Sequence, residues 1–538
     1  MADAMPDSVL PGPVPLPPPA AGARSTAEAD TAAPDSAGLG TAAPDIASSN
    51  IVASDIAGPA APKATVTLVL VAAAGLMVSL SLSLLVPVLP QLAAQLHASA
   101  SSAEWLLTAT LLAGAVAVPV LGRLGDLYGK KRILVVSLVT FLAGSLICAF
   151  TSDMGVMIAG RAVTGLSVAA IPLGISLVGT VLPSARAGSG IALISAMLGV
   201  GSALGLPLAG VIAEHADYHV LFWICVGGGA VTLAGIVALV PEPPVAGHGK
   251  FDLPGALLLA VALTALLLPL SQASVWGWAD VKTTGLLAAA VVLLIVFVGV
   301  ERRRASPVVD IAVNARPALL LTNIASLAVG FALFAVLIGT ANFVEAPAAA
   351  GYGFGATVLT GGLCLLPSGL FMLILSPVSA RISALAGPKV TLALGAAVVG
   401  AGFLLRVFLV AYLWEIVAGT AVTGAGTGIA YAAMPSLILR TAPRAELAAA
   451  NGLNSLARTA GSSLASALGG TVLASQTVTL AGLTYPSLAA YRTLFAICAA
   501  AALAGTLTAL AIPLSSASAE DPAGTDTAGR RAPRRAEG

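Results

Sequence analysis

The chain has 538 residues, of which 58% are hydrophobic and only 9% are charged, and its formal net charge is +1. A water-soluble protein of this length needs far more polar surface than this composition offers. The composition therefore excludes a soluble globular protein, gives no sign of nucleic-acid binding, and predicts a protein that crosses a membrane many times.

The two ends of the chain differ from its middle. Residues 1–63 are rich in Pro, Ala, Asp and Ser and contain few large apolar side chains, and residues 514–538 are similar. Such segments bury too little surface to offset the entropy that is lost on ordering, so we predict two disordered tails. The first tail also lacks the basic start and short apolar run of a secretory signal peptide.

Between the tails we identify fourteen apolar segments, and a helix of about 20 residues is what a hydrocarbon core about 30 Å thick requires. Such segments must be helical, because every backbone group in lipid needs an internal hydrogen-bond partner. We therefore predict an all-α membrane protein. The predicted spans are 66–89, 104–121, 133–151, 155–181, 188–212, 220–240, 253–272, 283–300, 318–344, 354–376, 389–410, 414–438, 446–473 and 490–513.

The distribution of Lys and Arg predicts the orientation of these spans. If the N-terminus lies inside, twenty of the 25 basic residues fall in inner segments and only two, Lys282 and Arg492, fall in outer loops. The other three, Arg161, Arg406 and Arg458, lie within spans. Since inner loops carry an excess of Lys and Arg, we predict a multi-pass plasma-membrane protein with both termini in the cytoplasm.

A charged stretch, LGRLGDLYGKKRIL at 121–134, separates the second span from the third. Its glycines permit a tight turn and a close approach of helices. Asp126 opposes the dipole at the end of its helix and so needs a cationic or amide partner. We expect a latch that ties helix ends together in one conformation; the alternative is a plain topology anchor. The latch residues are Gly122, Asp126, Gly129, Lys130, Lys131 and Arg132.

Short matches eight spans apart indicate an internal repeat. AGRAVTG at 159–165 returns as AGTAVTG at 418–424, GSALG at 201–205 returns within ASALGG at 465–470, and the stretch after span 2 has a weaker counterpart at 375–387. Two six-helix halves with a site between them are typical of secondary transporters. We predict halves at 64–240 and 317–513, with two extra helices and their flanking loops at 241–316.

These motifs resemble those of a known family. GRLGDLYGKKR is similar to the loop between helices 2 and 3 of the major facilitator superfamily, and Arg161 resembles the arginine of its helix 4. The glycine-rich segment 199–214 resembles helix 5 of its antiporters, although Leu206 stands where they have proline. Fourteen spans resemble the drug:proton antiporter branch, which implies efflux of drugs or antibiotics. That branch usually carries an aspartate in its first helix, and Ser81 stands at that position here.

Several candidate residues lie inside spans. A charge at membrane depth is costly unless it is paired, so we expect a functional role for Arg161, with a structural bond to a neighbouring helix as the alternative. Asn451, Asn454 and Arg458 share one helix face, which we expect to line a central cavity or to face another helix. Small residues of span 5 form an expected packing seam, at Gly201, Gly205, Pro207 and Gly210.

Charged residues near the outer ends of spans complete the set of candidates. Glu104, Glu345 and Glu415 are expected on a solvated outer rim, and Glu345 is the candidate coupling carboxylate if a proton is carried. Arg406 is expected to extend its guanidinium to the membrane interface. The four cysteines fall in apolar runs and are expected to pack as small hydrophobes.

The sequence contains no Gly-x-x-x-x-Gly-Lys-Ser/Thr loop and no His, Cys or carboxylate cluster, so we predict neither an enzyme nor a metal or cofactor site. Our prediction is a monomeric secondary transporter that exports a small amphipathic compound by alternating access, with the bilayer and protons as its other partners and no nucleic acid. The alternative is a transporter-like facilitator or sensor without proton coupling, which Ser81 favours.

Overall fold

The computed structural model describes residues 61–245, 247, 249–480 and 483–513. Apart from residues 61–63, the two tails predicted to be disordered lie outside this range. The helices are α1 (Ala61–Ser83), α2 (Leu89–Gln95), α3 (Ala100–Tyr128), α4 (Lys130–Phe150), α5 (Met154–Gly165), α6 (Ala170–Val181), α7 (Ser184–His215), α8 (His219–Leu239), α9 (Leu253–Trp276), α10 (Val281–Glu301), α11 (Ile311–Asn314), α12 (Pro317–Glu345), α13 (Val358–Leu385), α14 (Pro388–Phe408), α15 (Leu413–Thr441), α16 (Leu447–Ser475) and α17 (Leu488–Ala511).

Long helices confirm the prediction of an all-α membrane protein. Within the described residues, twelve spans are long and apolar enough to cross a bilayer. The predicted spans 318–344 and 446–473 correspond to α12 and α16, each 29 residues long, which are not among the twelve. Many Asn, Ser, Thr and Gly residues make α16 less apolar than its neighbours. The number of fourteen crossings therefore stays a prediction.

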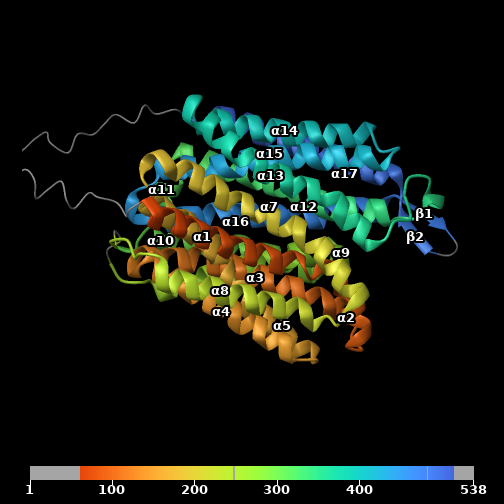
Figure 1. The fold of residues 1–538 in the computed structure, drawn as a ribbon, viewed down its shortest axis with the longest axis horizontal. Coiled ribbons are helices and arrows are strands. Elements are labelled where there is room, and N and C mark those ends of the chain that lie inside the picture. Colours follow the sequence, from red (N-terminus) through yellow and green to blue (C-terminus); the bar gives the residue numbers. More distant parts are fainter. Residues whose placement is uncertain (1–60, 246, 248, 481–482, 514–538) are drawn as a thin grey trace, which may run out of the picture. The chain divides into compact units, whose positions relative to one another are not determined.

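The long helices run side by side (Figure 1). Helices α1, α3 to α6 and α8 pack mainly against one another, and so do α12 to α17, with α4 against α8, α12 against α16 and α14 against α17. Helix α7 packs against α1 of the first group and still more extensively against α13 of the second. The two groups meet where α7 packs along α13 and where α3 packs against α16. In the predicted internal repeat α3 and α7 correspond to α13 and α16, so these two contacts would be equivalent.

The two helices between these groups form a hairpin. Helix α9 packs along α10 and also against α3 and α16, so the insertion lies beside one of the two contacts between the groups. On α9, the Gln272 amide donates to the Thr108 hydroxyl of α3 over 3.3 Å. A short antiparallel hairpin, β1 (Thr477–Leu480) and β2 (Leu483–Pro486), follows α16 and was not predicted from the sequence.

Helix ends differ from the predicted spans where polar residues extend a helix beyond its apolar part. The second span was predicted to end at 121, but α3 continues to Tyr128 and only Gly129 separates it from α4. Gly129 has a φ of 112°, a conformation that favours glycine, and this permits the sharp turn between the two helices. Asp126 therefore lies on a helix and not in a loop.

The fourth predicted span is interrupted near its middle. A 3₁₀ turn at Leu166–Ala169 separates α5 from α6. Pro172 lies just after this turn, lacks a backbone N–H, and would crowd the carbonyl of residue 168 in a regular α-helix. The change of helix type thus has a local cause in the sequence.

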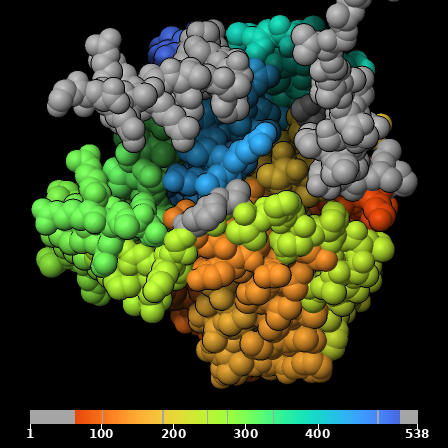
Figure 2. Space-filling view, turned by 90° about the vertical axis from the view of Figure 1, so that its left-hand side faces the viewer, coloured from red at the N-terminus to blue at the C-terminus, as the bar shows by residue number. Residues whose placement is uncertain are grey.

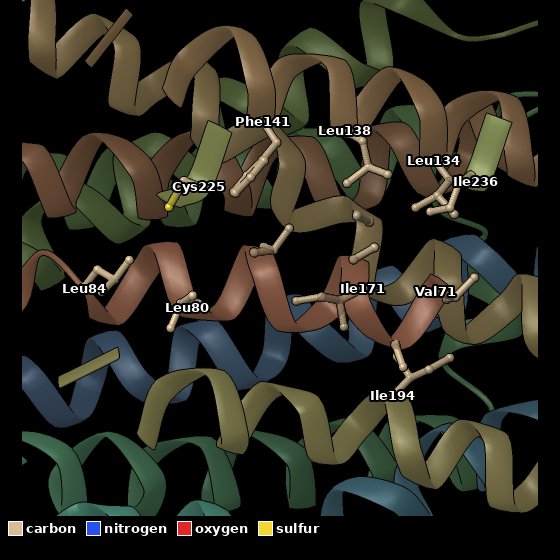
Figure 3. Packing of buried hydrophobic residues seen from close by; sticks show 14 of the residues in the cluster. Val71, Leu80, Leu84, Leu134, Leu138, Phe141, Ile171, Ile194, Cys225 and Ile236 are labelled. Carbon is tan, nitrogen blue, oxygen red and sulfur yellow. The ribbon is translucent and has the colours of Figure 1, made fainter. Parts of the chain in front are cut away.

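Large apolar side chains fill the interior of the first group of helices. Figure 3 shows Val71 and Leu80 of α1, Phe141 of α4, Ile171 of α6 and Ile236 of α8 within one buried cluster. The side chain of Phe141 is fully buried. As predicted, the four cysteines pack as buried residues, and all four are free thiols: Cys148, Cys225, Cys364 and Cys498.

Candidate functional site

Asp126 joins the two groups of helices. Its two carboxylate oxygens accept hydrogen bonds from the backbone N–H groups of Ala448 at 3.2 Å and Ala449 at 2.9 Å, in the first turn of α16. The first N–H groups of a helix have no partner within that helix, and the helix dipole favours an anion there. Asp126 is only 3% exposed, so this contact is shielded from water. The amide partner that the sequence required is therefore the start of a helix in the other half.

Glycine allows the two helices to approach this closely. A Cβ atom on Gly122 of α3 would lie 2.9 Å from the carbonyl oxygen of Ala448, and one on Gly452 of α16 would lie 2.9 Å from the carbonyl oxygen of Val118. Real Cβ atoms almost never come so near to a backbone atom, so any larger residue here would push α3 and α16 apart. Figure 2 shows this end of the bundle, where blue C-terminal residues touch the orange N-terminal helices.

The three basic residues of the charged stretch have different partners. Lys130 Nζ lies 3.9 Å from Asp126 Oδ1. Lys131 Nζ donates to the carbonyl of Val237, and the backbone N–H groups of Lys131 and Arg132 donate to the Glu242 carboxylate, each over 3.1 Å. Only Lys130 therefore contributes directly to the Asp126 contact. The other two fasten the start of α4 to the last turn of α8 and to Glu242 just after it.

Glu242 is a residue that the sequence analysis missed. Besides accepting the two N–H groups at the start of α4, it lies 3.9 Å from Arg132 Nε. A cavity of about 10 Å³ beside Gly129 is lined by Asp126, Lys130 and Pro243 among others, which is space for about one water molecule. The charged end of α3 is thus a packed joint between helices and not a pocket for a transported compound.

Arg161 is almost completely buried, with 1% of its surface exposed. Its Nη1 donates to the Ser81 hydroxyl at 3.0 Å and its Nη2 to the Ser81 carbonyl at 3.3 Å, while its Nε has no partner. Both partners are neutral. The arginine and the residue at the position of the missing aspartate are therefore in direct contact, but the contact is not an ion pair.

The polar face predicted on α16 is buried beside α12 and α15. Arg458 Nη1 donates to Asn454 Oδ1 at 2.6 Å and its Nη2 donates to the Ser455 hydroxyl at 2.7 Å. The Asn454 amide in turn donates to Asn323 and Ser326 of α12. The guanidinium lies 5.0 Å from the ring centroid of Tyr431 on α15. Asn451, by contrast, donates only to the carbonyl of Leu447 in its own helix.

The small residues of α7 face two different helices. A Cβ on Gly201 would lie 2.9 Å from the carbonyl oxygen of Leu76 in α1, and one on Gly205 would meet Ser83. Gly210 lies beside Leu359 of α13, and a Cβ on Gly362 of α13 would lie 2.9 Å from Pro207 N. The predicted seam therefore divides: Gly201 and Gly205 pack within one half, whereas Pro207 and Gly210 pack against the other.

Comparison with known proteins decides the family. The family model described as Major Facilitator Superfamily matches residues 71–363 and 320–535. The chain belongs to the major facilitator superfamily. The human organic anion transporter MFSD10 has a similar fold, with a TM-score of 0.59, 15% sequence identity, and coverage of 83% of this chain and 99% of that one. At this identity the likeness concerns the fold alone.

Bacterial members of the superfamily are similar in sequence. The tetracenomycin C resistance and export protein of Streptomyces glaucescens is 27% identical over 76% of each chain. The probable actinorhodin transporter of Streptomyces coelicolor is 29% identical over 68% of this chain and 64% of its own. An uncharacterised MFS-type transporter of Mycobacterium tuberculosis is 32% identical over 55% of this chain, and the match spans only 42% of that relative. The family and these relatives are transporters and not enzymes.

Two charged residues near helix ends, Arg406 and Glu415, are buried, although the sequence predicted that both would reach the membrane surface. Arg406 does not reach an interface: its side chain is fully buried, with its guanidinium carbon 4.2 Å from the ring centroid of Phe495. Glu415 is not on a solvated rim, because it is 9% exposed and accepts the N–H groups of Ala411 and Tyr412 at the start of α15. Glu345, the last residue of α12, is half-buried beside Gly361.

Proposed function

We propose that this protein is a secondary active transporter that exports small amphipathic compounds by alternating access. The observation that carries this proposal is the Asp126 carboxylate, which belongs to one half and binds the first turn of α16 in the other. This contact joins the two halves at one end of the bundle. It must break when that end opens. The names of the antibiotic exporters among the relatives support export of drug-like or antibiotic compounds.

In this proposal the Asp126 end of the bundle faces the cytoplasm of a plasma-membrane protein, and both termini lie on that side. The one-sided distribution of Lys and Arg supports this orientation. The described structure is then the conformation in which the cytoplasmic end is closed. The residues that tie it are Gly122, Asp126, Gly129 and Lys130, and opening requires α3 to leave the start of α16.

Proton coupling requires a group that changes charge within the working pH range, which neither a serine nor an arginine does. Glu345 is our candidate, since it is half-buried and lies next to α13. We predict that Glu345→Gln abolishes export driven by a pH gradient but leaves substrate binding intact. Glu104→Gln, at the exposed start of α3, is the matched control. Normal export by Glu345→Gln would place the coupling group elsewhere.

A second candidate function is facilitated transport or sensing without a proton. The neutral Ser81–Arg161 contact favours it, because a carboxylate at position 81 would have been the expected proton carrier. An efflux and susceptibility panel in a pump-deficient host separates the two functions. Export that an uncoupler stops supports the antiporter, export that it does not affect supports a facilitator, and absence of export from the whole panel refutes transport of these compounds.

A further inference from the structure

The middle parts of the described helices contain positively charged side chains but no negatively charged ones. Every Asp and Glu that the structure describes lies in a loop or within five residues of the end of a helix. Arg161 lies seven residues from the nearer end of its span Met154–Val181, and Arg458 lies eleven residues from the nearer end of α16. Buried cations normally have an anionic partner, because removing a charge from water is costly. The described interior therefore has cations without matching carboxylates.

Of the three arginines within predicted spans, Arg458 lies nearest to the middle of its span. It lies eleven residues after Leu447, the first residue of α16, which is about 16 Å along the helix axis at 1.5 Å per residue. Half of a hydrocarbon core is about 15 Å. Substrates of secondary transporters bind near the bilayer midplane between the two repeats, so the depth of Arg458 is that of a transported compound.

The contacts of Arg458 leave part of its guanidinium free to bind another group. One of its N–H groups donates to Asn454 and another to Ser455, and both acceptors are neutral. A guanidinium has five N–H donors, so three remain. The Tyr431 ring covers one side at 5.0 Å, which stabilises a cation but supplies no hydrogen-bond acceptor for it. The side chain is held in place by neutral groups while its charge is left uncompensated.

The other two interior arginines are less suited to bind a ligand. Arg161 is 1% exposed and is fixed on Ser81, and Arg406 is fully buried against Phe495, whereas Arg458 is 8% exposed. Arg406 also lies in the last turn of α14, far from the middle of the span. Arg458 alone combines mid-span depth, spare donors and residual exposure.

We propose that the exported compound is an amphipathic organic acid whose anionic group binds the guanidinium of Arg458. This inference rests on the proposed function and names the substrate class. A carboxylate matches the planar fork of a guanidinium and accepts two parallel hydrogen bonds. The acid supplies the missing negative charge, and its apolar body packs against the apolar helices around it. An amine-bearing compound would place a second cation beside Arg458.

The test compares three probes that share one body. These are 8-(dansylamino)octanoic acid, its primary amide and the corresponding eight-carbon amine, titrated by fluorescence into the full chain in lipid nanodiscs. We expect the acid to bind at least about tenfold more tightly than the amide, because only the carboxylate offers the guanidinium a negative charge and two acceptor oxygens, and we expect the amine to bind most weakly. This comparison uses the unaltered protein, so it does not depend on the folding of a variant.

Variants then assign the preference to one residue. Arg458→Gln should remove the advantage of the acid over the amide by weakening the acid more than the amide, and Arg458→Lys should retain part of that advantage. Arg440→Gln removes the same charge at the exposed end of α15 and is the matched control, with no expected effect. Retention of the full preference for the acid by Arg458→Gln would overturn the assignment.

The outcomes separate this inference from the proposed function. Equal binding of acid and amide, preference for the amine, or binding of none of the three by a protein that still exports other compounds would each refute the inference alone. Export of bases but not acids in the susceptibility panel would do the same. Absence of export of every compound in the panel would instead refute the proposed function.

Discussion

Replacing Asp126 with asparagine tests whether the contact between α3 and α16 controls the conformation of the protein. The carboxylate accepts two hydrogen bonds, at 2.9 and 3.2 Å, and each charge-assisted bond is worth about 1.5–3 kcal/mol. Asparagine has one acceptor oxygen, so it keeps one neutral bond of about 1 kcal/mol and turns its NH₂ group toward the second amide. It also leaves Lys130, which is 7% exposed, without its anionic neighbour.

The expected loss is therefore about 2–5 kcal/mol in the free energy of the closed Asp126 end relative to its open form, or about 30- to 4,000-fold in their ratio. Spin labels on cysteines at Tyr128 and Leu385 report on this equilibrium by pulsed distance measurement. Both positions are exposed, at 49% and 90%, and lie at the ends of α3 and α13. We expect Asp126→Asn to shift the distances to longer values and to reduce export strongly at normal membrane abundance.

Asp153→Asn provides the matched control for this experiment. Asp153 also accepts a backbone N–H at a helix start, from Val156 at 2.8 Å, but both residues belong to the same half. Its substitution should leave distances and export unchanged. If Asp126→Asn is well expressed, exports at nearly the wild-type rate and keeps the closed distances, then the charged stretch is only a topology anchor.

Three further predictions concern helix packing, a buried charge and the orientation of the chain. Gly122→Val should shift the spin-label distances as Asp126→Asn does, because its Cβ would lie 2.9 Å from the Ala448 oxygen, whereas Gly188→Val, with nothing within 4 Å, should not. Ser81→Asp should raise the Tm of the purified protein by a few degrees, because it places an anion beside Arg161; a lower Tm would show that Arg161 is already balanced. Single cysteines at Ala279 and Ala348 should react with an impermeant thiol reagent added to intact cells, and those at Tyr128 and Ala305 should not; labelling of Ala305 from outside would refute the predicted orientation.

Long apolar segments were sufficient to predict the long helices, because a span in lipid has to be both long and apolar. The family was predicted from the motifs, above all the charged stretch at 121–134. The exact helix ends were harder to predict. Helix α3 extends seven residues beyond the predicted end at 121, because backbone hydrogen bonds continue through polar residues once the chain leaves the hydrocarbon. The length of an apolar segment reflects the thickness of the hydrocarbon core, and the helix can be longer than that segment.

The sequence predicted which type of group each buried charge needs as a partner, but not which residue supplies that group. The sequence indicated that Asp126 needs a cation or an amide, yet the amides of Ala448 and Ala449 belong to residues with no polar side chain. Arg406 was misplaced for a related reason: its position near the end of a helix gives no information about Phe495, which belongs to α17 and covers it. Contacts between segments distant in sequence depend on the packing of the whole bundle.

The two sides of the Asp126 contact also differ in how easily a mutation can remove them. One partner is a side chain, which many single substitutions of its codon remove, while the other consists of backbone amides that every amino acid except proline supplies. Proline is well tolerated in the first turn of a helix, so a proline at Ala449 would delete a donor without unfolding α16. Selection on this joint should therefore retain a single residue type at Asp126. At Ala448 and Ala449 it should exclude proline and, because both residues are buried against α3, large side chains.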